Sequence, residues 1–202
     1  MSVRTSARPW WVALRAMLVF TVVLGVAYTA LLTGVGQLVL PHQANGSTVS
    51  SGGSVVGSSL IGQSFADEDG KPLARWFQSR PSAAGDGYDA SASSASNLGP
   101  SNADLASSIK DRRAAIAAFE GVAPAAVPDD ALTASGSGLD PAISPAYALL
   151  QVKRVAAATG LSDAVVHRLV ESRISGREAG YLGEPTVNVL ELNVALAALT
   201  KD

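Results

Sequence analysis

Residues 16–40 read AMLVFTVVLGVAYTALLTGVGQLVL, and no charged side chain interrupts these 25 positions. At about 1.5 Å per residue, an α-helix of this length reaches roughly 37 Å. A hydrocarbon layer is about 30 Å thick, so the helix is long enough to cross it with some tilt. The apolar region of a cleaved secretory signal is only about 7–15 residues long. The stretch therefore predicts a transmembrane helix over 16–40.

The charges that flank this stretch predict its orientation. Arg4, Arg8 and Arg15 precede it without any acidic residue, and the first charged side chain beyond Leu40 is Asp67. Positively charged flanks stay on the cytoplasmic side of a membrane. We therefore expect residues 1–15 in the cytoplasm and everything after Leu40 outside it, with the helix ending at Pro41.

Composition limits the size and chemistry of the chain beyond the helix. Residues 41–53 are expected to form a polar connector, and 54–202 are enough for one soluble domain with a modest core. The chain has no cysteine, which excludes disulfides and a thiol nucleophile, and its net charge of −2 argues against a nucleic-acid partner. The predicted class is α+β: one amino-terminal transmembrane helix followed by a single extracytoplasmic α+β domain.

Local patterns predict the elements of that domain. We expect two short strands at 55–56 and 60–61, separated by a turn or bulge at Gly57. Glycine- and serine-rich residues 82–100 are expected to form an ordered loop anchored by Tyr88. The remaining predicted elements are a helix capped by Ser101 that ends at Gly121, a helix from Ser144-Pro145 to Gly160, a helix from Ser162 to Arg173, a strand at 187–189, and a last helix capped by Asn188 that carries Leu192, Leu196 and Leu199.

Two stretches raise the question of catalysis or ligand binding. Residues 132–141, LTASGSGLDP, could cradle an anion on their backbone amides, although a strained structural turn is the favoured interpretation. They match neither a phosphate-binding loop nor the Gly-x-Ser-x-Gly pattern of a serine hydrolase. Asp163, His167 and Glu171 share a helix face; they could bind a metal, but a solvated row of ion pairs is favoured.

No catalytic set emerges from these patterns, because the only two histidines lie far apart and no Ser-His-Asp arrangement is indicated. A membrane-anchored, non-catalytic accessory subunit is the default interpretation. Two alternatives stay open: an extracytoplasmic hydrolase that uses Ser135 or Ser137, and an envelope scaffold or adhesion domain.

A series of segments, in order, covers nearly the whole chain and resembles the C subunit of the Kdp potassium-transporting P-type ATPases. These segments are the amino-terminal membrane helix, 43–47 (QANGS), 57–65 (GSSLIGQSF), 80–83 (RPSA), 96–102 (SNLGPSN), 133–141 (TASGSGLDP), 154–156 (RVA) and 182–193 (LGEPTVNVLELN). The resemblance implies an accessory subunit of an ATP-driven potassium uptake complex in a bacterial inner membrane.

The family also implies partners. It describes a channel-like A subunit, an ATP-hydrolysing B subunit and a small F subunit, with the C subunit acting as a chaperone that raises the ATP affinity of B and as a cap near the external ion entrance. ATP is thus implied by the family alone, and no resident cofactor or metal is expected. Direct nucleotide contact conflicts with the predicted orientation, because ATP is cytoplasmic.

Polar residues within the resembling segments are the candidates for binding a ligand or a partner. We expect the neutral, hydroxyl-rich loops 97–102 and 133–140 to dock near the ion entrance, although docking by the two helices after Ser144 is an equal alternative. The candidates are Gln63, Arg80, Asn97, Asn102, Ser135, Ser137 and Asp140.

Overall fold

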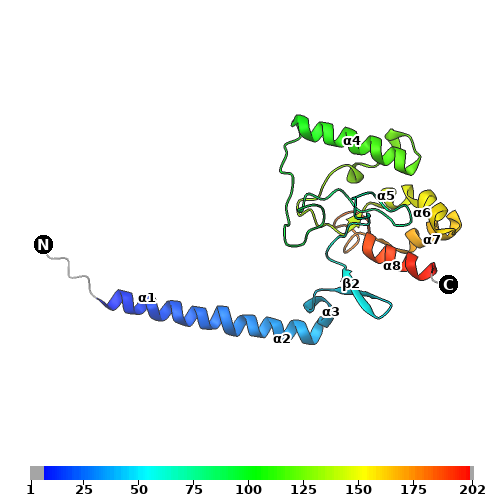
Figure 1. Cartoon of the computed structure of the whole chain (residues 1–202). Helices are drawn as coiled ribbons and strands as arrows, with labels where there is room; N and C mark the ends of the chain where they lie inside the picture. Colours follow the sequence, from blue (N-terminus) through cyan, green and yellow to red (C-terminus); the bar gives the residue numbers. More distant parts are fainter. Residues whose placement is uncertain (1–6, 201–202) are drawn as a thin grey trace. The chain divides into compact units, whose positions relative to one another are not determined.

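The computed structural model describes residues 7–200 and contains two compact units, Met1–Thr48 and Val49–Asp202 (Figure 1). Within the described residues the protein is a mixture of helices and small antiparallel sheets, as predicted, with one long apolar helix near the amino terminus. Of the three arginines that predict its orientation, Arg4 lies outside the described residues, as does the terminal Asp202.

The first unit is dominated by a continuous helical run. It consists of α1 (Ala7–Phe20), a π-helical segment η1 (Thr21–Tyr28) and α2 (Thr29–Val39). Within the described residues, Arg8–Val39 is the one helix long and apolar enough to cross a membrane, which confirms that element of the prediction. At the end of the π-helical segment the Thr29 hydroxyl donates to the Leu24 carbonyl at 3.5 Å, a contact of the kind expected for threonine in an apolar helix.

A short hydrogen-bonded corner follows this run. Proline cannot continue a helix but suits its first turn, and Pro41 accordingly begins the four-residue α3 (Pro41–Ala44) after α2 has ended. The side-chain amides of Gln37 and Asn45 exchange two hydrogen bonds, of 3.3 and 3.0 Å, across the corner. The residues predicted to be a polar connector thus include a short helix.

The first hairpin differs from the prediction. Strand β1 (Thr48–Ser51) pairs with β2 (Ser54–Ser58), and the turn between them is Gly52-Gly53, both with positive φ. Gly57 lies inside β2, and Leu60-Ile61 form a turn after it, so the predicted second strand at 60–61 is wrong. Threonine and serine dominate β1, and apolar periodicity therefore did not reveal it.

The helix α4 (Ala103–Glu120) begins one residue later than predicted. Its cap is Asn102, not Ser101: the Asn102 side chain accepts from the backbone amides of Asp104 and Leu105 at 2.7 and 3.2 Å. Asparagine is at least as good an N-cap as serine, so both residues were plausible. The helix ends at Gly121 in the left-handed conformation, as predicted, and two 3₁₀ turns follow, η2 (Pro124–Ala126) and η3 (Asp129–Ala131).

The carboxyl-terminal part packs four helices around a three-stranded sheet (Figure 1). The strands have the order β3–β5–β4, and Val187 in the central strand pairs with Ile143 on one side and with Ile174 on the other. The elements are β3 (Ala142–Ile143), α5 (Pro145–Leu150), α6 (Val152–Thr159), α7 (Asp163–Ser172), β4 (Ile174–Ser175), β5 (Thr186–Asn188) and α8 (Val189–Leu199).

Capping explains where these helices begin. The Ser144 hydroxyl accepts from the Tyr147 amide, and the Asn188 side chain accepts from the Glu191 amide, which confirms both predicted caps. Ser162 occupies the N-cap position of α7 without a side-chain capping bond. The predicted helix from Ser144 to Gly160 is interrupted at Gln151 into α5 and α6.

The core lies between the sheet and these helices. Leu192 and Leu196 of α8 are fully buried, as predicted, whereas Leu199 is 48% exposed. The largest fully buried side chains are Phe77, Leu132, Ile143, Leu192, Leu196, Gln151, Val155, Val166, Val170, Val187 and Val189. Gln151 stands out in this set, because a fully buried amide requires hydrogen-bond partners.

Candidate functional site

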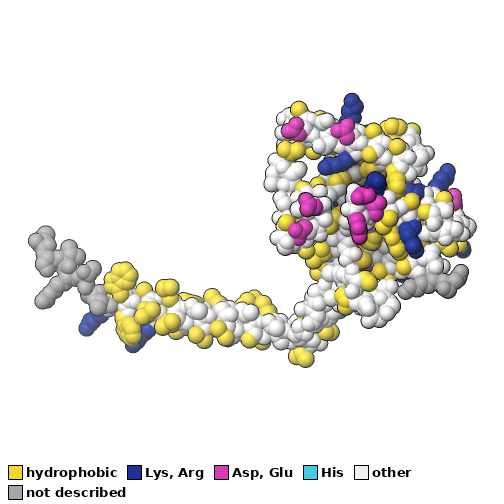
Figure 2. Space-filling view, viewed as in Figure 1, with side chains coloured by type: hydrophobic (Ala, Val, Ile, Leu, Met, Phe, Trp, Pro, Cys, Tyr) yellow, Lys and Arg dark blue, Asp and Glu magenta, His cyan; other side chains and the backbone are white. Residues whose placement is uncertain are grey.

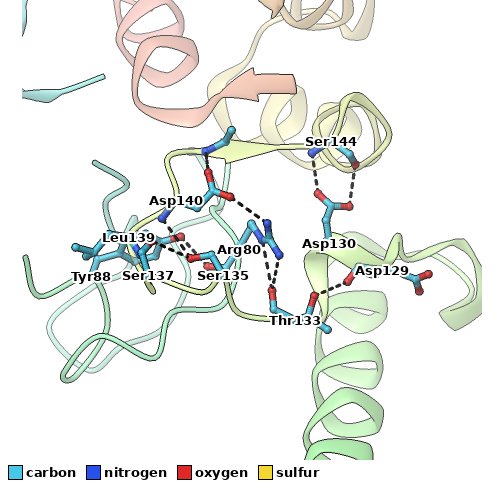
Figure 3. A network of polar contacts seen from close by, with 11 residues as sticks. Arg80, Tyr88, Asp129, Asp130, Thr133, Ser135, Ser137, Leu139, Asp140 and Ser144 are labelled. Atoms are coloured by element: carbon cyan, nitrogen blue, oxygen red, sulfur yellow. Dashed lines mark hydrogen bonds and ion pairs between the residues drawn. The ribbon is translucent and has the colours of Figure 1, made fainter. Parts of the chain in front are cut away.

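The ion pair between Arg80 and Asp140 joins two loops that are distant in sequence. Nη1 of Arg80 lies 3.0 Å from Oδ2 of Asp140, and the side chains are 22% and 33% exposed (Figure 3). The same guanidinium donates to the Thr133 carbonyl from Nε and Nη2, at 3.4 and 3.3 Å. One arginine thus holds both ends of the 133–140 loop.

The serines of this loop are bonded within it. The Ser135 and Ser137 hydroxyl oxygens lie 3.4 Å apart, the Leu139 amide donates to Ser137, and the Asp140 amide donates to Ser135 (Figure 3). No histidine is among the hydrogen-bond partners of either hydroxyl in the described structure. The arrangement therefore resembles a structural turn and lacks the adjacent base that activates a serine nucleophile.

The glycine- and serine-rich loop 82–100 packs directly on this turn. Ser82 donates to the Gly138 carbonyl at 2.6 Å, and Ser93 and Ser94 both donate to the Ser137 carbonyl at 3.0 Å. The loop is ordered, as predicted. The backbone contact also requires glycine at position 138, since a Cβ there would lie 2.6 Å from the Ser94 carbonyl oxygen.

Tyr88 anchors the loop, as predicted. Its hydroxyl donates to the Arg80 carbonyl at 2.9 Å, and its backbone amide donates to the Ser82 hydroxyl at 2.8 Å. Burial of the ring raises the pKa of Tyr88 to about 12, because the phenolate form would lose its hydration. The phenol is therefore a neutral hydrogen-bond donor at physiological pH.

The structure brings together four of the seven candidate residues, Arg80, Ser135, Ser137 and Asp140, and leaves the other three apart from this network. Asn97 adopts a left-handed conformation and donates to the Ala95 carbonyl, Asn102 caps α4, and Gln63 donates to the Val56 carbonyl in the hairpin. Each of the seven side chains thus has an intramolecular partner.

Both loops predicted to dock nevertheless border a common hollow. A cleft of about 230 Å³ lies between them and α4, and Arg112 of α4, whose Nη1 donates to the Leu132 carbonyl at 2.9 Å, lines it. Figure 2 shows basic side chains on the surface beneath α4. The residues lining the cleft are Ala83, Ser96, Leu98, Leu105, Ser108, Arg112, Thr133 and Ala134.

The face of α7 that could have bound a metal carries a contact between His167 and Glu171, which is an ion pair only when the imidazole is protonated. Nδ1 of His167 lies 3.3 Å from Oε2 of Glu171, and both side chains are about half exposed. Among the described residues, no three histidine, cysteine or carboxylate side chains are gathered closely enough to hold a metal ion. His167 and Glu171 therefore fit the row of ion pairs favoured from the sequence.

Known proteins match this chain over nearly its whole length. The family model described as "KdpC: K+-transporting ATPase, c chain" matches residues 10–198. The chain belongs to the KdpC family. The resemblance seen in the sequence is confirmed.

Relatives named "Potassium-transporting ATPase KdpC subunit" share about half of their residues with this chain. The protein of Kineococcus radiotolerans is 57% identical over 180 residues, which is 89% of this chain and 88% of the relative. Those of Mycobacterium tuberculosis and Streptomyces avermitilis are 50% and 46% identical, covering 93% and 98% of this chain and 96% and 97% of theirs. With one helix among its described residues that is long and apolar enough to cross a membrane, this chain is thus a potassium-transport subunit of an ATPase complex and fits a single-pass membrane protein.

The most connected polar residue of this KdpC chain was not among the sequence candidates. Arg154 of α6 pairs with Glu120 of α4 at 3.0 Å, and the two side chains are 7% and 0% exposed. The guanidinium also donates to the carbonyls of Ala74 and Trp76 and to Gln151 Oε1. Arg154 thus fastens α4 and the 74–76 loop to α6.

Gln151 extends this buried network. Its amide accepts from the Gln78 backbone N–H at 2.7 Å and donates to the Gln78 carbonyl at 3.2 Å. One signal in the sequence could have revealed it: a glutamine between Leu150 and Val152 interrupts an apolar helical stripe. Such a residue is buried only if it has hydrogen-bond partners.

Proposed function

We propose that this chain is a non-catalytic accessory subunit that assembles with the A, B and F subunits of a Kdp-type potassium uptake complex in a bacterial plasma membrane. Its layout in this proposal is a cytoplasmic segment 1–15, a membrane helix 16–40, a connector 41–53 and an extracytoplasmic domain 54–202. The observation that supports this orientation is the charge asymmetry: three arginines precede the apolar helix, and no acidic residue does.

This orientation determines how the subunit can act on the ATPase. Nucleotide is cytoplasmic, so a domain on the outer face would change ATP affinity only through its effect on the assembled complex. We therefore assign the chaperone role described for the family to stabilisation of the complex from outside. In linkage terms, a subunit that binds one conformation of the complex more tightly shifts the population towards it.

We assign docking near the ion entrance to the cleft that loops 97–102 and 133–140 share. Leu98 is 38% exposed at its edge and offers an apolar contact, while the ion pair of Arg80 with Asp140 keeps one wall in place. A rigid surface suits a protein contact because little conformational entropy is lost when it binds.

The orientation can be tested directly because the chain has no cysteine. Lys153→Cys places one thiol on an exposed part of the domain, and Ser2→Cys places one before the membrane helix. We expect a membrane-impermeant maleimide to label the Lys153→Cys variant in intact spheroplasts and the Ser2→Cys variant only after permeabilisation. The reverse pattern would reject the external location of the domain.

The docking surface needs a separate experiment. In the assembled complex, a photoactivatable crosslinker on Leu98→Cys is expected to capture the channel-like subunit, whereas the same probe on Leu182→Cys, a position at least as exposed, is the control. Efficient capture of the cytoplasmic domains of the ATPase subunit from position 98 would contradict both the docking site and the orientation.

A further inference from the structure

The segment that follows the membrane helix exposes a cluster of apolar side chains. Beyond Leu40, the described chain has nine exposed large hydrophobic residues, and four of them lie between Val55 and Ile61. Scattered exposed apolar residues are normal on a protein surface, but a concentration of them marks a contact with a protein or a membrane. Their exposed fractions are 64% for Val55, 37% for Val56, 63% for Leu60 and 37% for Ile61.

The two faces of strand β2 differ in their surroundings. Val56 lines a small cavity of about 190 Å³ together with Trp76 and Leu190. Val55, its neighbour in the strand, is 64% exposed and does not line this cavity. Val55 is therefore largely exposed to solvent in the described structure, as is Leu60.

Several contacts hold this segment firmly in place. Gln63 donates to the Val56 carbonyl at 2.8 Å, Asn188 donates to the Ser59 carbonyl at 2.7 Å, and the Gly62 amide donates to the Leu139 carbonyl at 2.8 Å. A Cβ on Gly57 would lie 2.9 Å from the Leu190 side chain, so the strand also packs closely on α8. The exposed apolar side chains are thus presented on a fixed support.

Charge distinguishes this segment from the rest of the domain. From Ala16 to Ala66 the chain contains no lysine, arginine, aspartate or glutamate, so the uncharged region continues well past the membrane helix. All acidic residues, and all lysines and arginines except the three before the helix, come later. An uncharged surface with exposed valine and leucine suits the boundary between lipid headgroups and acyl chains, where charged groups are costly.

The covalent connection keeps the hairpin near the bilayer. Eight residues, 40–47, separate Val39, the end of α2, from Thr48, the start of β1, so the connection spans at most about 32 Å at full extension. Four of them form α3, which shortens the connection further. The length of the connection therefore limits how far β1 can lie from the end of α2.

We propose that the hairpin segment 48–61 rests on the lipid bilayer through its exposed apolar side chains, with Val55 and Leu60 reaching into the headgroup region. Because no charged side chain takes part, this contact is independent of anionic lipid and of salt. The surface orients the domain on the membrane and leaves the cleft beneath α4 available for another subunit.

The contact can be measured on the full chain in phosphatidylcholine liposomes and again in the assembled complex. An environment-sensitive fluorophore is attached in turn to Val55→Cys, Leu60→Cys and Leu182→Cys, the last a 53% exposed position near the charged Arg177 and Glu184. The first two probes are expected to show a blue-shifted emission and strong quenching by a nitroxide lipid in both preparations, unchanged by high salt. The probe at 182 should behave as in water, and Val55→Asp should reduce the quenching of the probe at position 60.

Two results would overturn the proposal. One is water-like emission from the probes at 55 and 60 in both preparations. The other is shielding of these probes only in the assembled complex and without lipid quenching, since a protein surface would then cover the hairpin. The measurement does not depend on which side of the membrane the domain occupies, so it can fail or succeed separately from the orientation test.

Discussion

Asn193 and Phe77 exchange two hydrogen bonds across 116 residues of sequence. The Phe77 backbone N–H donates to the Asn193 side-chain oxygen at 2.9 Å, and the Asn193 amide donates to the Phe77 carbonyl at 2.9 Å. Gln151 makes the same pair of bonds to Gln78. The side-chain amides of Asn193 and Gln151 thus bond to the backbone N–H and C=O groups of residues 77 and 78, as a neighbouring strand would. The irregular loop can therefore pass through the core with these backbone groups hydrogen-bonded.

Replacement of Asn193 by alanine should therefore destabilise the domain strongly. It leaves a buried N–H and a buried C=O of Phe77 without partners, at about 2–4 kcal/mol in total. Asn102→Ala is the matched control, because that asparagine likewise bonds to two backbone groups but lies at a helix terminus open to water, where about 1 kcal/mol is expected. Thermal unfolding of the full chain in detergent measures the stability of both variants. Equal losses of stability would contradict the proposed role of the buried hydrogen bonds between Asn193 and Phe77.

The pair of Arg154 with Glu120 predicts a severe and specific loss. Arg154→Met leaves a fully buried carboxylate without its counter-ion, which typically costs about 3–5 kcal/mol. The double variant Arg154→Met with Glu120→Leu removes both charges and should recover much of this stability. A double variant no more stable than Arg154→Met would show that the hydrogen bonds of Arg154 to carbonyls matter more than the ion pair.

The same carboxylate predicts a component of the pH dependence. Burial raises the pKa of Glu120 above its ordinary value of 4.5, and the Arg154 guanidinium opposes this only in part. A group whose pKa is raised by folding stabilises the folded state fully below its unfolded pKa, and this contribution is lost as pH rises through the folded pKa. As the pH rises above 4.5, the melting temperature of the unmodified protein should therefore fall more than that of the Glu120→Gln variant. Melting temperatures measured for both proteins over the same pH series test this.

The ion pair at the candidate site should contribute less to stability than to local order. Arg80 and Asp140 are partly exposed, so Asp140→Asn is expected to lower the free energy of unfolding by only about 1 kcal/mol. Hydrogen exchange of the backbone amides at 133–140 should nevertheless speed up, because the guanidinium no longer holds both ends of the loop. Lys71→Met removes an ion pair whose side chains are 76% and 79% exposed, and it should change neither quantity.

Glycine at position 138 is required by two independent features. It has a φ of 69°, and a Cβ would lie 2.6 Å from the Ser94 carbonyl oxygen, so Gly138→Ala should cost about 1–3 kcal/mol and loosen the packing of the two loops. Gly136→Ala is the control two residues away, since a Cβ there has no neighbour within 4 Å. Comparable melting temperatures for the two variants would contradict the close approach of the loops.

The sequence patterns succeeded where a local rule decides the structure. An uncharged stretch of 25 residues is long enough for a membrane helix, and Ser144, Asn188, Gly121 and Gly160 mark helix ends through their own side-chain or backbone preferences. The hairpin failed because the Thr-Val-Ser-Ser strand has little apolar periodicity, and the cap of α4 was misplaced because Ser101 and Asn102 are both good caps.

The sequence predicted the candidate site only in part. The sequence indicated that Arg80, Ser135, Ser137 and Asp140 lie in segments typical of the family, but it contained no sign that Arg80 pairs with Asp140 or that Ser82, Ser93 and Ser94 bind the turn at 137–138. Those contacts join residues 43 to 60 positions apart, and no local pattern encodes which distant backbone a residue will reach.

The amino-acid sequence alone determined that this protein has an uncharged apolar stretch long enough to cross a membrane, three arginines before that stretch, no cysteine, and helices beyond it whose ends carry recognisable caps. Only the tertiary structure decided that Asn193, Gln151 and Arg154 hold the irregular loops from inside the core. The physical reason is that a helix or a membrane span depends on neighbours within a few residues, whereas a buried amide or guanidinium is stable only where the whole fold brings its partners to it.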